Sequence, residues 1–270
     1  MSLGTMIGAL VGIGLILLAI FEEAHGKPFG TALLMYWHLG GLSIVVGGTL
    51  ASTYICYEAR YVNLAVKAAF TIYTAPAISR TLIKGEVGRI IRWGYVMQKS
   101  GAPGLESEAK KLKNLDKFLS FGLDCVIAGY SGEEIRHILE TAVETTYNRN
   151  IVPANILKVM GGIGPAFGMV GTLLGMVMMM GSMGGDPSAL GSSLSTALTA
   201  TLYGVLSARL LWFPAAEKIK QRQEIIKFRN NLVAEGLVLL AEKRSPRFIQ
   251  DRMNAFLDPA IHFNLDKDIK

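Results

Sequence analysis

The segment GGIGPAFGMVGTLLGMVMMMGSMG, residues 161–184, combines eight glycines and one proline with no charged residue. In a water-soluble helix each glycine would cost about 1 kcal/mol relative to alanine. In lipid, small residues allow two helices to approach closely, so that van der Waals contact offsets this cost. The segment therefore predicts a membrane helix that packs tightly against another helix.

The composition of the whole chain agrees with a membrane location. Hydrophobic residues make up 51% of the 270 residues, charged residues make up 18%, and the mean hydropathy is +0.37. A soluble domain carries about 25% charged residues. The apolar residues form four blocks, each long enough to cross a hydrocarbon core of about 30 Å. We therefore predict an all-α membrane protein with four transmembrane helices, in the blocks Leu3–Phe21, Phe29–Tyr57, Val159–Met183 and Leu190–Ala208.

The distribution of Lys and Arg predicts the orientation. Lys27 is the only basic residue in the two short connections that join spans one to two and three to four. All other Lys and Arg residues lie in the 58–158 segment or from Arg209 onward, so both termini and the long middle segment are expected in the cytoplasm. This topology accounts for the net charge of +6 without nucleic acid. No basic residue precedes the first block, which predicts a retained helix and not a signal peptide.

This pattern divides the chain into four parts. We expect transmembrane helices one and two in residues 1–57, a helical cytoplasmic domain in 58–156, transmembrane helices three and four in 157–213, and a helical cytoplasmic tail in 214–270. KSGAPG, residues 99–104, predicts a helix break, with a further helix running from Leu105 through Val126. SGEE, residues 131–134, matches a capping box, and SPRF, residues 245–248, matches a helix start with Ser245 as cap.

Two stripes of small or polar residues mark the third and fourth spans. Gly161, Gly164, Gly168, Thr172 and Gly175 share one helical face, and Pro165 interrupts the hydrogen-bond ladder within that span. Either the stripes pack helices within one subunit, or they form a moving or ion-lining interface. The fourth-span stripe consists of Ser192, Ser195, Thr196, Thr199 and Tyr203, with Thr201 and Ser207 more to the side.

Ionisable groups are scarce in the four spans. Ion and proton pathways in membranes usually need such a group at depth, yet only His38, in span two, qualifies. A lone histidine near the end of a span is more often an interfacial or hydrogen-bonded residue than a proton relay. If this protein conducts ions, the carboxylate must come from another chain.

The motifs around spans three and four carry a family resemblance. GPAFGMVGTLLGMV and DPSALGSSLSTALTATLYGVLSARLLWFPAAEKI closely resemble the flagellar stator A-subunits of the MotA and PomA type, and more distantly TolQ and ExbB. The resemblance implies a non-enzymatic protein of the bacterial inner membrane without a bound cofactor. It also implies a homopentamer, with lipid around it, surrounding two MotB-like subunits. Each of those would supply a transmembrane aspartate, so that proton or sodium flow turns the rotor through FliG.

The resemblance also implies roles for individual residues. By position, Pro165 and Pro214 match prolines that couple ion flow to conformational change, and Gly168 lies in the same helix as Pro165. Thr172 and Thr201 match hydroxyl positions beside the ion path and are candidates for a transient sodium contact. Tyr203 matches a neighbouring aromatic position, and Ser195 and Thr199 complete the expected ion path.

The rotor-contact region matches less well. The family has an arginine followed about eight residues later by a glutamate; Glu106 fits the second position, but Gln98 occupies the first. Arg92 and Lys99 lie nearby, so the rotor contact is expected among Arg92, Gln98, Lys99 and Glu106. The threonine at position 172 favours sodium slightly over protons. The alternatives are a TolQ/ExbB-like energiser of envelope transport or gliding, and a structural membrane scaffold without conduction.

Overall fold

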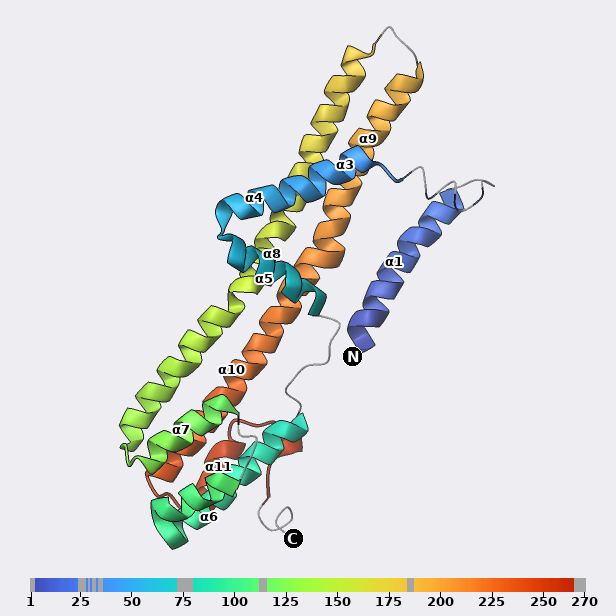
Figure 1. Cartoon of the computed structure of the whole chain (residues 1–270). Coiled ribbons are helices and arrows are strands. Elements are labelled where there is room, and N and C mark those ends of the chain that lie inside the picture. The colour runs from blue at the N-terminus through green and yellow to red at the C-terminus, as the bar shows by residue number, and fades with distance from the viewer. Residues whose placement is uncertain are drawn as a thin grey trace. The chain divides into compact units, whose positions relative to one another are not determined.

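The structure is a computed structural model that describes residues 3–23, 28, 30, 33, 36–71, 80–111, 116–183 and 187–264. Within these residues every regular element is helical, as predicted (Figure 1). The elements are α1 (Leu3–Glu23), α3 (Leu39–Leu42), the π-helix η1 (Ser43–Gly47), α4 (Gly48–Cys56), α5 (Ala59–Phe70), α6 (Arg80–Lys111), α7 (Lys117–Ile127), α8 (Gly132–Gly181), α9 (Pro187–Leu206), the π-helix η3 (Ser207–Trp212), α10 (Phe213–Ala241), α11 (Pro246–Asn254) and the 3-10 helix η4 (Pro259–Ile261).

The chain forms two compact units. Unit 1 consists of Met1–Ala75 and Ile151–Gln221, and unit 2 consists of Pro76–Asn150 and Arg222–Lys270. The 50-residue helix α8 and the helix α10 each contribute residues to both units. α8 continues through Pro153 and Pro165, and α10 extends to Ala241 within the segment expected to form a helical tail.

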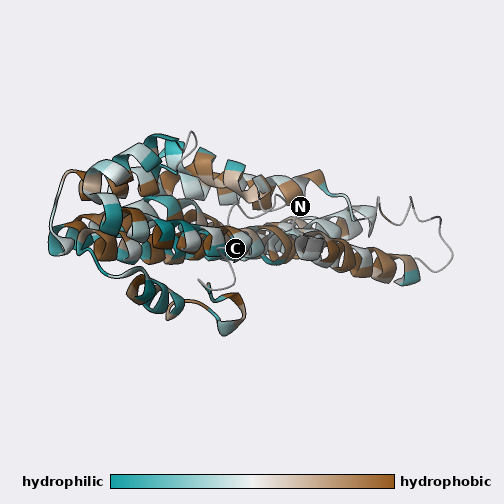
Figure 2. Cartoon of the chain, turned by 90° about the horizontal axis from the view of Figure 1, so that it is seen from below, coloured by the Kyte–Doolittle hydropathy of each residue, from teal (hydrophilic) through white to brown (hydrophobic). Residues whose placement is uncertain are grey.

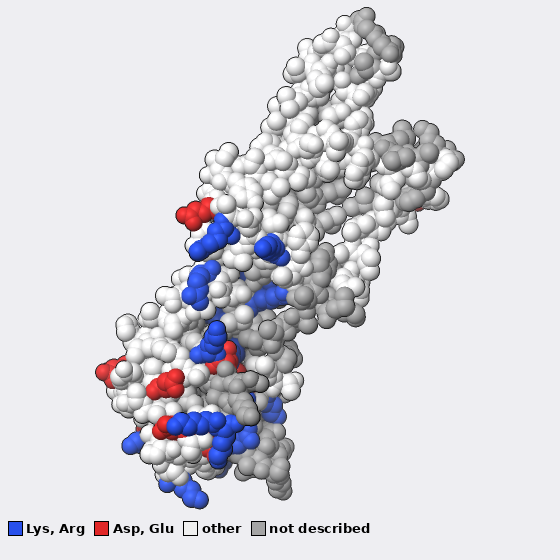
Figure 3. Space-filling view, viewed as in Figure 1, with Lys and Arg blue, Asp and Glu red and all other residues white. Residues whose placement is uncertain are grey.

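Unit 1 contains the candidate membrane helices. Three helical stretches of the described residues are long and apolar enough to span a bilayer: Leu39–Cys56, part of Gly132–Gly181, and part of Leu190–Ala241. The apolar part of α1, Met6–Glu22, is slightly shorter. Large hydrophobic side chains such as Leu10, Val177 and Met180 are about two-thirds exposed, as expected where lipid is the solvent. Figure 2 shows how hydrophobic residues dominate these helices, and Figure 3 shows no charged side chain over the upper part of the view, where α8 ends and α9 begins.

Unit 2 has its own hydrophobic core. α6, α7, α10 and α11 and the first part of α8 supply its buried residues, among them Ile90, Leu123, Leu139 and Leu237. The predicted helix starts are confirmed. The backbone N–H of Ser131 donates to Glu134 Oε2 (2.8 Å), while the N–H of Glu134 donates to Ser131 Oγ (3.3 Å). Ser245 Oγ accepts from the N–H of Phe248 (3.3 Å), with Pro246 as the first helical residue.

The middle of unit 2 differs in part from the sequence-based expectation. The break in KSGAPG is confirmed, because Gly101 has φ 63° and ψ −160° and so divides α6 into two arms. The single helix predicted from Leu105 through Val126 is wrong. α6 ends at Lys111, and Asp116 has extended backbone angles (φ −59°, ψ 141°) just before α7 begins. Residues 112–115 and, in the short connection between spans three and four, residues 184–186 lie outside the described residues.

Candidate functional site

The glycine stripe of α8 faces α9 of the same chain. A Cβ atom at Gly168 would lie 3.1 Å from the carbonyl oxygen of Ala200, one at Gly171 would lie 2.4 Å from Ala200 Cβ, and one at Gly175 would lie 2.7 Å from Ala197 Cβ. Side chains at these positions would push α8 and α9 apart. Of the two interpretations of the stripe, packing within one subunit accounts for these glycines.

This close approach brings Thr172 and Thr201 together. Their hydroxyl oxygens are in direct hydrogen-bond contact across the α8–α9 crossing. Both hydroxyls also lie within reach of the Gly168 carbonyl oxygen, at 3.1 Å for Thr172 and 3.3 Å for Thr201. Thr172 Oγ1 is also 3.3 Å from the carbonyl oxygen of Ala197. The hydroxyl oxygens of Thr172 and Thr201 and the carbonyl oxygens of Gly168 and Ala197 therefore form one cluster around Thr172 Oγ1. Such a cluster suits a small cation or a chain of proton-carrying hydrogen bonds.

Three other hydroxyls of α9, those of Ser195, Thr196 and Tyr203, contact the residues just before α3. Ser195 Oγ is 3.0 Å from His38 Nε2, and the backbone N–H of His38 donates to the Tyr203 hydroxyl (3.0 Å). Tyr203 in turn donates to the carbonyl oxygen of Tyr36. Ser195 and Tyr203, which are ion-path candidates by sequence together with the threonines, lie beside His38. Thr196 belongs to the same stripe but is not among the residues expected in the ion path. Its Oγ1 lies 3.2 Å from His38 Nδ1.

Thr199 is the most buried member of the stripe. Its side chain is 6% exposed, and its hydroxyl donates to carbonyl oxygens of its own helix, at Ser195 (2.8 Å) and Thr196 (3.2 Å). A Cβ atom at Gly41 would lie 3.4 Å from Thr199 Oγ1 and 3.2 Å from the Ala200 nitrogen. Thr199 therefore lies where α3 packs on α9, and Gly41 permits this contact.

The two prolines lie at different kinds of position. Pro165 lies inside α8, and its Cα is 3.1 Å from the place that a Cβ of Gly204 would occupy. Pro214 is exposed in the first turn of α10, immediately after the π-helix η3. Pro165 thus belongs to the α8–α9 crossing that holds the threonine pair, and it lies about two turns before Thr172 along α8.

The expected rotor-contact residues lie in α6 of unit 2. Arg92, Gln98 and Lys99 are exposed on the first arm, and Glu106 follows the break at Gly101 on the second arm. The Glu106 carboxylate pairs with Lys110 one turn later (2.6 Å). The four side chains are therefore distributed over both arms of a bent helix.

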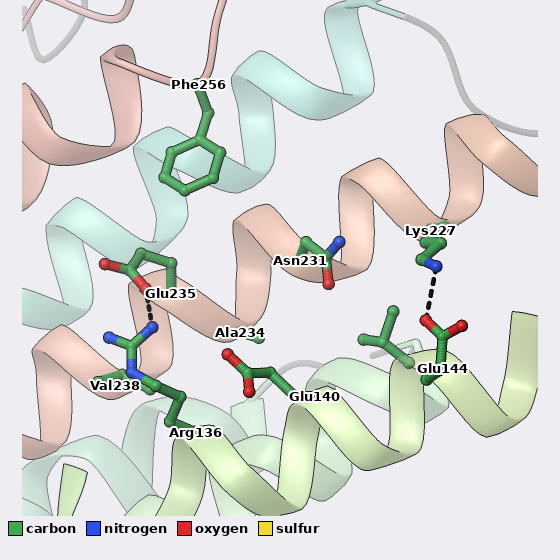
Figure 4. A pocket seen from close by; sticks show the side chains of 10 residues that line it. Arg136, Glu140, Glu144, Lys227, Asn231, Ala234, Glu235, Val238 and Phe256 are labelled. Carbon is green, nitrogen blue, oxygen red and sulfur yellow. Dashed lines mark hydrogen bonds and ion pairs between the residues drawn. The ribbon is translucent and has the colours of Figure 1, made fainter. Parts of the chain in front are cut away.

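Ion pairs join α10 to the rest of unit 2. The Arg229 guanidinium, 6% exposed, binds both oxygens of Glu86, with Nε 2.7 Å from Oε2, and Asp116 Oδ2 (2.5 Å). A second network joins Glu235 to Arg136 (2.6 Å) and Arg252 (2.9 Å) beside a pocket of about 370 Å³ (Figure 4). Among the described residues no group of three His, Cys, Asp or Glu side chains is arranged to hold a metal ion.

The Glu235 network predicts an acid-sensitive contribution to stability. Burial raises the pKa of the Glu235 carboxyl, but the hydrogen bonds and charges of Arg136 and Arg252 outweigh burial, so its pKa lies below the ordinary value of 4.5. As the pH falls, the Glu235 carboxyl is therefore protonated at a higher pH in the unfolded chain than in the folded protein, which favours unfolding. The stabilisation is complete above about pH 4.5 and is lost as the pH falls through the lower folded-state pKa.

We expect Glu235→Gln to lower the free energy of unfolding by about 1.5–3 kcal/mol at neutral pH. The loss of stability is measured by thermal melting of the detergent-solubilised protein at a series of pH values between 7 and 3. The variant should lose less stability on acidification than the wild type, because it has no carboxylate to protonate. Parallel pH curves for the two proteins would contradict the assignment. Glu108→Gln is a suitable control, since the Glu108–Lys111 pair is exposed on α6 and does not belong to this network.

Comparisons with known proteins agree with this arrangement. The family model of the MotA/TolQ/ExbB proton channel family matches residues 110–231. Motility protein A of Borreliella burgdorferi is 29% identical over 273 residues, covering 100% of this chain and 99% of that protein. Chemotaxis protein PomA of Vibrio alginolyticus is 24% identical, covering 96% of each chain.

A solved structure shares the fold. The flagellar MotAB stator complex from Bacillus subtilis contains a chain that matches with a TM-score of 0.80 and 22% identity, covering 96% of both chains. The family match includes all of α7 and α8, all of α9 with its threonine at position 201, and the first part of α10. In sequence, over residues 110–231, this chain matches the MotA/TolQ/ExbB proton channel family, and over nearly its full length it is similar to motility proteins A.

Proposed function

We propose that this protein is the A-subunit of an ion-driven flagellar stator. The observation that carries the proposal is the convergence of the Thr172 and Thr201 hydroxyls on the Gly168 carbonyl at the close crossing of α8 and α9. Relatives named as motility proteins match over nearly the full length of the chain. This is why we favour the stator over a TolQ/ExbB-like energiser.

The proposal extends to topology and partners. α1 also spans the membrane, as the first of four transmembrane helices: its 21 residues would extend about 31 Å as a helix. Both termini and unit 2 lie on the cytoplasmic side of the bacterial inner membrane, as the positions of Lys and Arg favour. Five copies surround two MotB-like subunits, and a carboxylate of each partner lies near the Thr172–Thr201 pair. This supplies the acidic group that the four spans themselves lack.

Force transmission is assigned to unit 2 and the prolines. Pro165 and Gly168 lie within the α8–α9 crossing, so a change in ion occupancy at Thr172 can alter this crossing directly. Pro214, the second residue of α10 after η3, is the second proline to which we assign this coupling. Exposed residues Arg92, Gln98, Lys99 and Glu106 contact the rotor protein FliG, with the bend at Gly101 presenting two helical arms.

Rescue of swimming tests the proposal. The chain is produced together with its cognate single-span partner in cells that lack their own stator, and swimming speed is recorded in sodium-replete and sodium-free medium. We expect rescue, and dependence on sodium if Thr172 replaces part of the hydration shell of that ion. Swimming that requires no sodium but collapses with the proton gradient identifies a proton-driven stator. No rescue with any ion, despite correct membrane insertion, would reject the flagellar role.

A further inference from the structure

Charged residues first appear at one boundary of the apolar part of unit 1. The spanning stretch Leu39–Cys56 ends just before α5 begins. Lys158 and Arg209, both exposed, directly adjoin the apolar blocks Val159–Met183 and Leu190–Ala208. Basic residues at the end of an apolar helix mark the level at which the hydrocarbon core gives way to lipid headgroups.

One face of α5 packs across these helix ends. Val62, Ala65 and Ala69 are fully buried and recur three and four residues apart. Figure 1 shows α5 lying crosswise over α8, and because the apolar part of α8 is long enough to span a bilayer, a helix crosswise to it runs along the membrane surface. Ala65 and Ala69 share a core with residues of α8, η3 and α10, namely Ala154, Ile156, Leu157, Met160, Trp212, Ala215, Ala216 and Ile219.

The opposite face of α5 combines basic and apolar side chains. Arg60 and Lys67 are both exposed and lie two turns apart, about 10.5 Å along the helix. Leu64, between them, is 51% exposed, and Phe70 is 66% exposed. A helix with this outer face is suited to the headgroup region, where its apolar side chains reach the acyl chains and its basic side chains reach the phosphates.

The basic residues of this region outnumber the acidic ones. Among the described residues, no carboxylate forms an ion pair with Arg60, Lys67, Lys158 or Arg209. Figure 3 shows basic side chains gathered just below the uncharged upper part of the view. This charge is complementary to anionic headgroups. The segments 54–71, 151–160 and 205–221 contain six basic and two acidic residues, which are Arg60, Lys67, Lys158, Arg209, Lys218 and Lys220 against Glu58 and Glu217.

Tyrosines at the α4–α5 junction support the same position. Tyr54 is 43% exposed, and its hydroxyl donates to Asn63 Oδ1 (2.7 Å), which ties the end of α4 to α5. The Arg60 guanidinium lies 5.0 Å from the centre of the Tyr61 ring, and its Nη2 donates to the Tyr61 hydroxyl (3.2 Å). Tyrosine is enriched at membrane–water interfaces, because its ring is apolar and its hydroxyl is polar.

We propose that the outer face of α5, defined by Arg60, Leu64, Lys67 and Phe70, binds anionic phospholipids of the surrounding bilayer. Arg60 and Lys67 bind headgroup phosphates, and Leu64 and Phe70 enter the boundary with the acyl chains. Through its buried face, α5 then holds the packed ends of α8 and α10 at the membrane surface. The site requires only a membrane location, whereas its assignment to the cytoplasmic leaflet rests on the proposed stator topology.

A lipid titration tests this proposal. The full chain is purified in detergent, and its melting temperature is measured as phosphatidylglycerol, phosphatidylcholine or glycerol 3-phosphate is added. The test variant carries Arg60→Gln and Lys67→Gln, two changes at exposed positions of α5. The control variant carries Lys243→Gln and Arg247→Gln, which remove two exposed positive charges from unit 2.

We expect phosphatidylglycerol to raise the wild-type melting temperature well above the effect of phosphatidylcholine. In the test variant the apparent affinity for phosphatidylglycerol should fall about thirtyfold, because each basic side chain near an anionic surface contributes a factor of about five. The control should respond as the wild type does. Equal effects of the two lipids on the wild type, or an unchanged affinity in the test variant, would overturn the proposal. An equal response to glycerol 3-phosphate would overturn it in favour of a soluble anion.

The mass of the purified protein separates lipid binding from contact with another copy of the chain. We expect light scattering to give the same protein mass for the test variant and the wild type. A smaller mass for the test variant would show that the outer face of α5 packs against protein, and the lipid site would be rejected. Neither measurement uses ion flow or swimming, so failure of the proposed stator function would leave the result on α5 unaffected.

Discussion

Replacement of Arg229 by methionine is expected to lower the free energy of unfolding by about 3–5 kcal/mol, the largest stability effect that we predict for unit 2. The Glu86 side chain is 8% exposed and the Arg229 side chain is 6% exposed, so the substitution leaves a carboxylate in the protein interior without its partner. Asp116, about half exposed, loses the same guanidinium but can be solvated. The cost therefore comes chiefly from Glu86.

The double variant Arg229→Met, Glu86→Gln separates this cost from lost packing. It removes the unpaired charge together with the guanidinium, so it should regain a substantial part of the stability. Thermal melting of the solubilised full chain, followed by circular dichroism, measures both. A single Arg229→Met variant as stable as the wild type would mean that the buried pair contributes nothing to unit 2.

Replacement of Gly204 by alanine is expected to disrupt the α8–α9 crossing. The added Cβ would lie 2.8 Å from the carbonyl oxygen of Gly164, 3.1 Å from Pro165 Cα and 3.2 Å from Gly168 Cα. All three are backbone atoms, so no side-chain rotation can relieve the contact, and the two helices must separate. Overpacking of this kind costs about 1–3 kcal/mol or more, and here it also separates Thr172 from Thr201.

Two measurements on Gly204→Ala check this prediction. The melting temperature of the solubilised chain should fall, and motor function should be lost even where protein remains in the membrane. Gly181→Ala is the matched control in α8, because a Cβ there meets nothing within 4 Å. Equal behaviour of the two variants would show that α8 and α9 tolerate a wider separation than the structure contains.

Local features of the fold were predictable from sequence because their causes are local. The capping box at Ser131, the break at Gly101 and the close helix packing of Gly168 and Gly175 each follow from residues within a few positions of one another. The helix predicted from Leu105 through Val126 failed for a related reason. Apolar spacing continues across residues 112–116, yet Asp116 adopts an extended backbone and reaches Arg229, 113 residues away in sequence.

Long-range partners were not predictable in this way. Helical spacing puts Thr172 on the glycine face and Thr201 to the side of the α9 stripe, but it does not reveal that the two hydroxyls meet. Nor does it separate Ser195 and Tyr203, which contact the His38 region, from the threonine pair.

Ion uptake by Thr172→Val and Thr172→Ser, each reconstituted with the partner subunit, tests the central claim most directly. Valine keeps the shape of threonine and removes the hydroxyl, whereas serine keeps the hydroxyl that contacts Thr201 and Gly168. We predict that uptake falls at least about a hundredfold with valine, about 2.7 kcal/mol on the barrier, and is largely retained with serine. Uptake by Thr172→Val at the wild-type rate would contradict an ion path through the threonine pair.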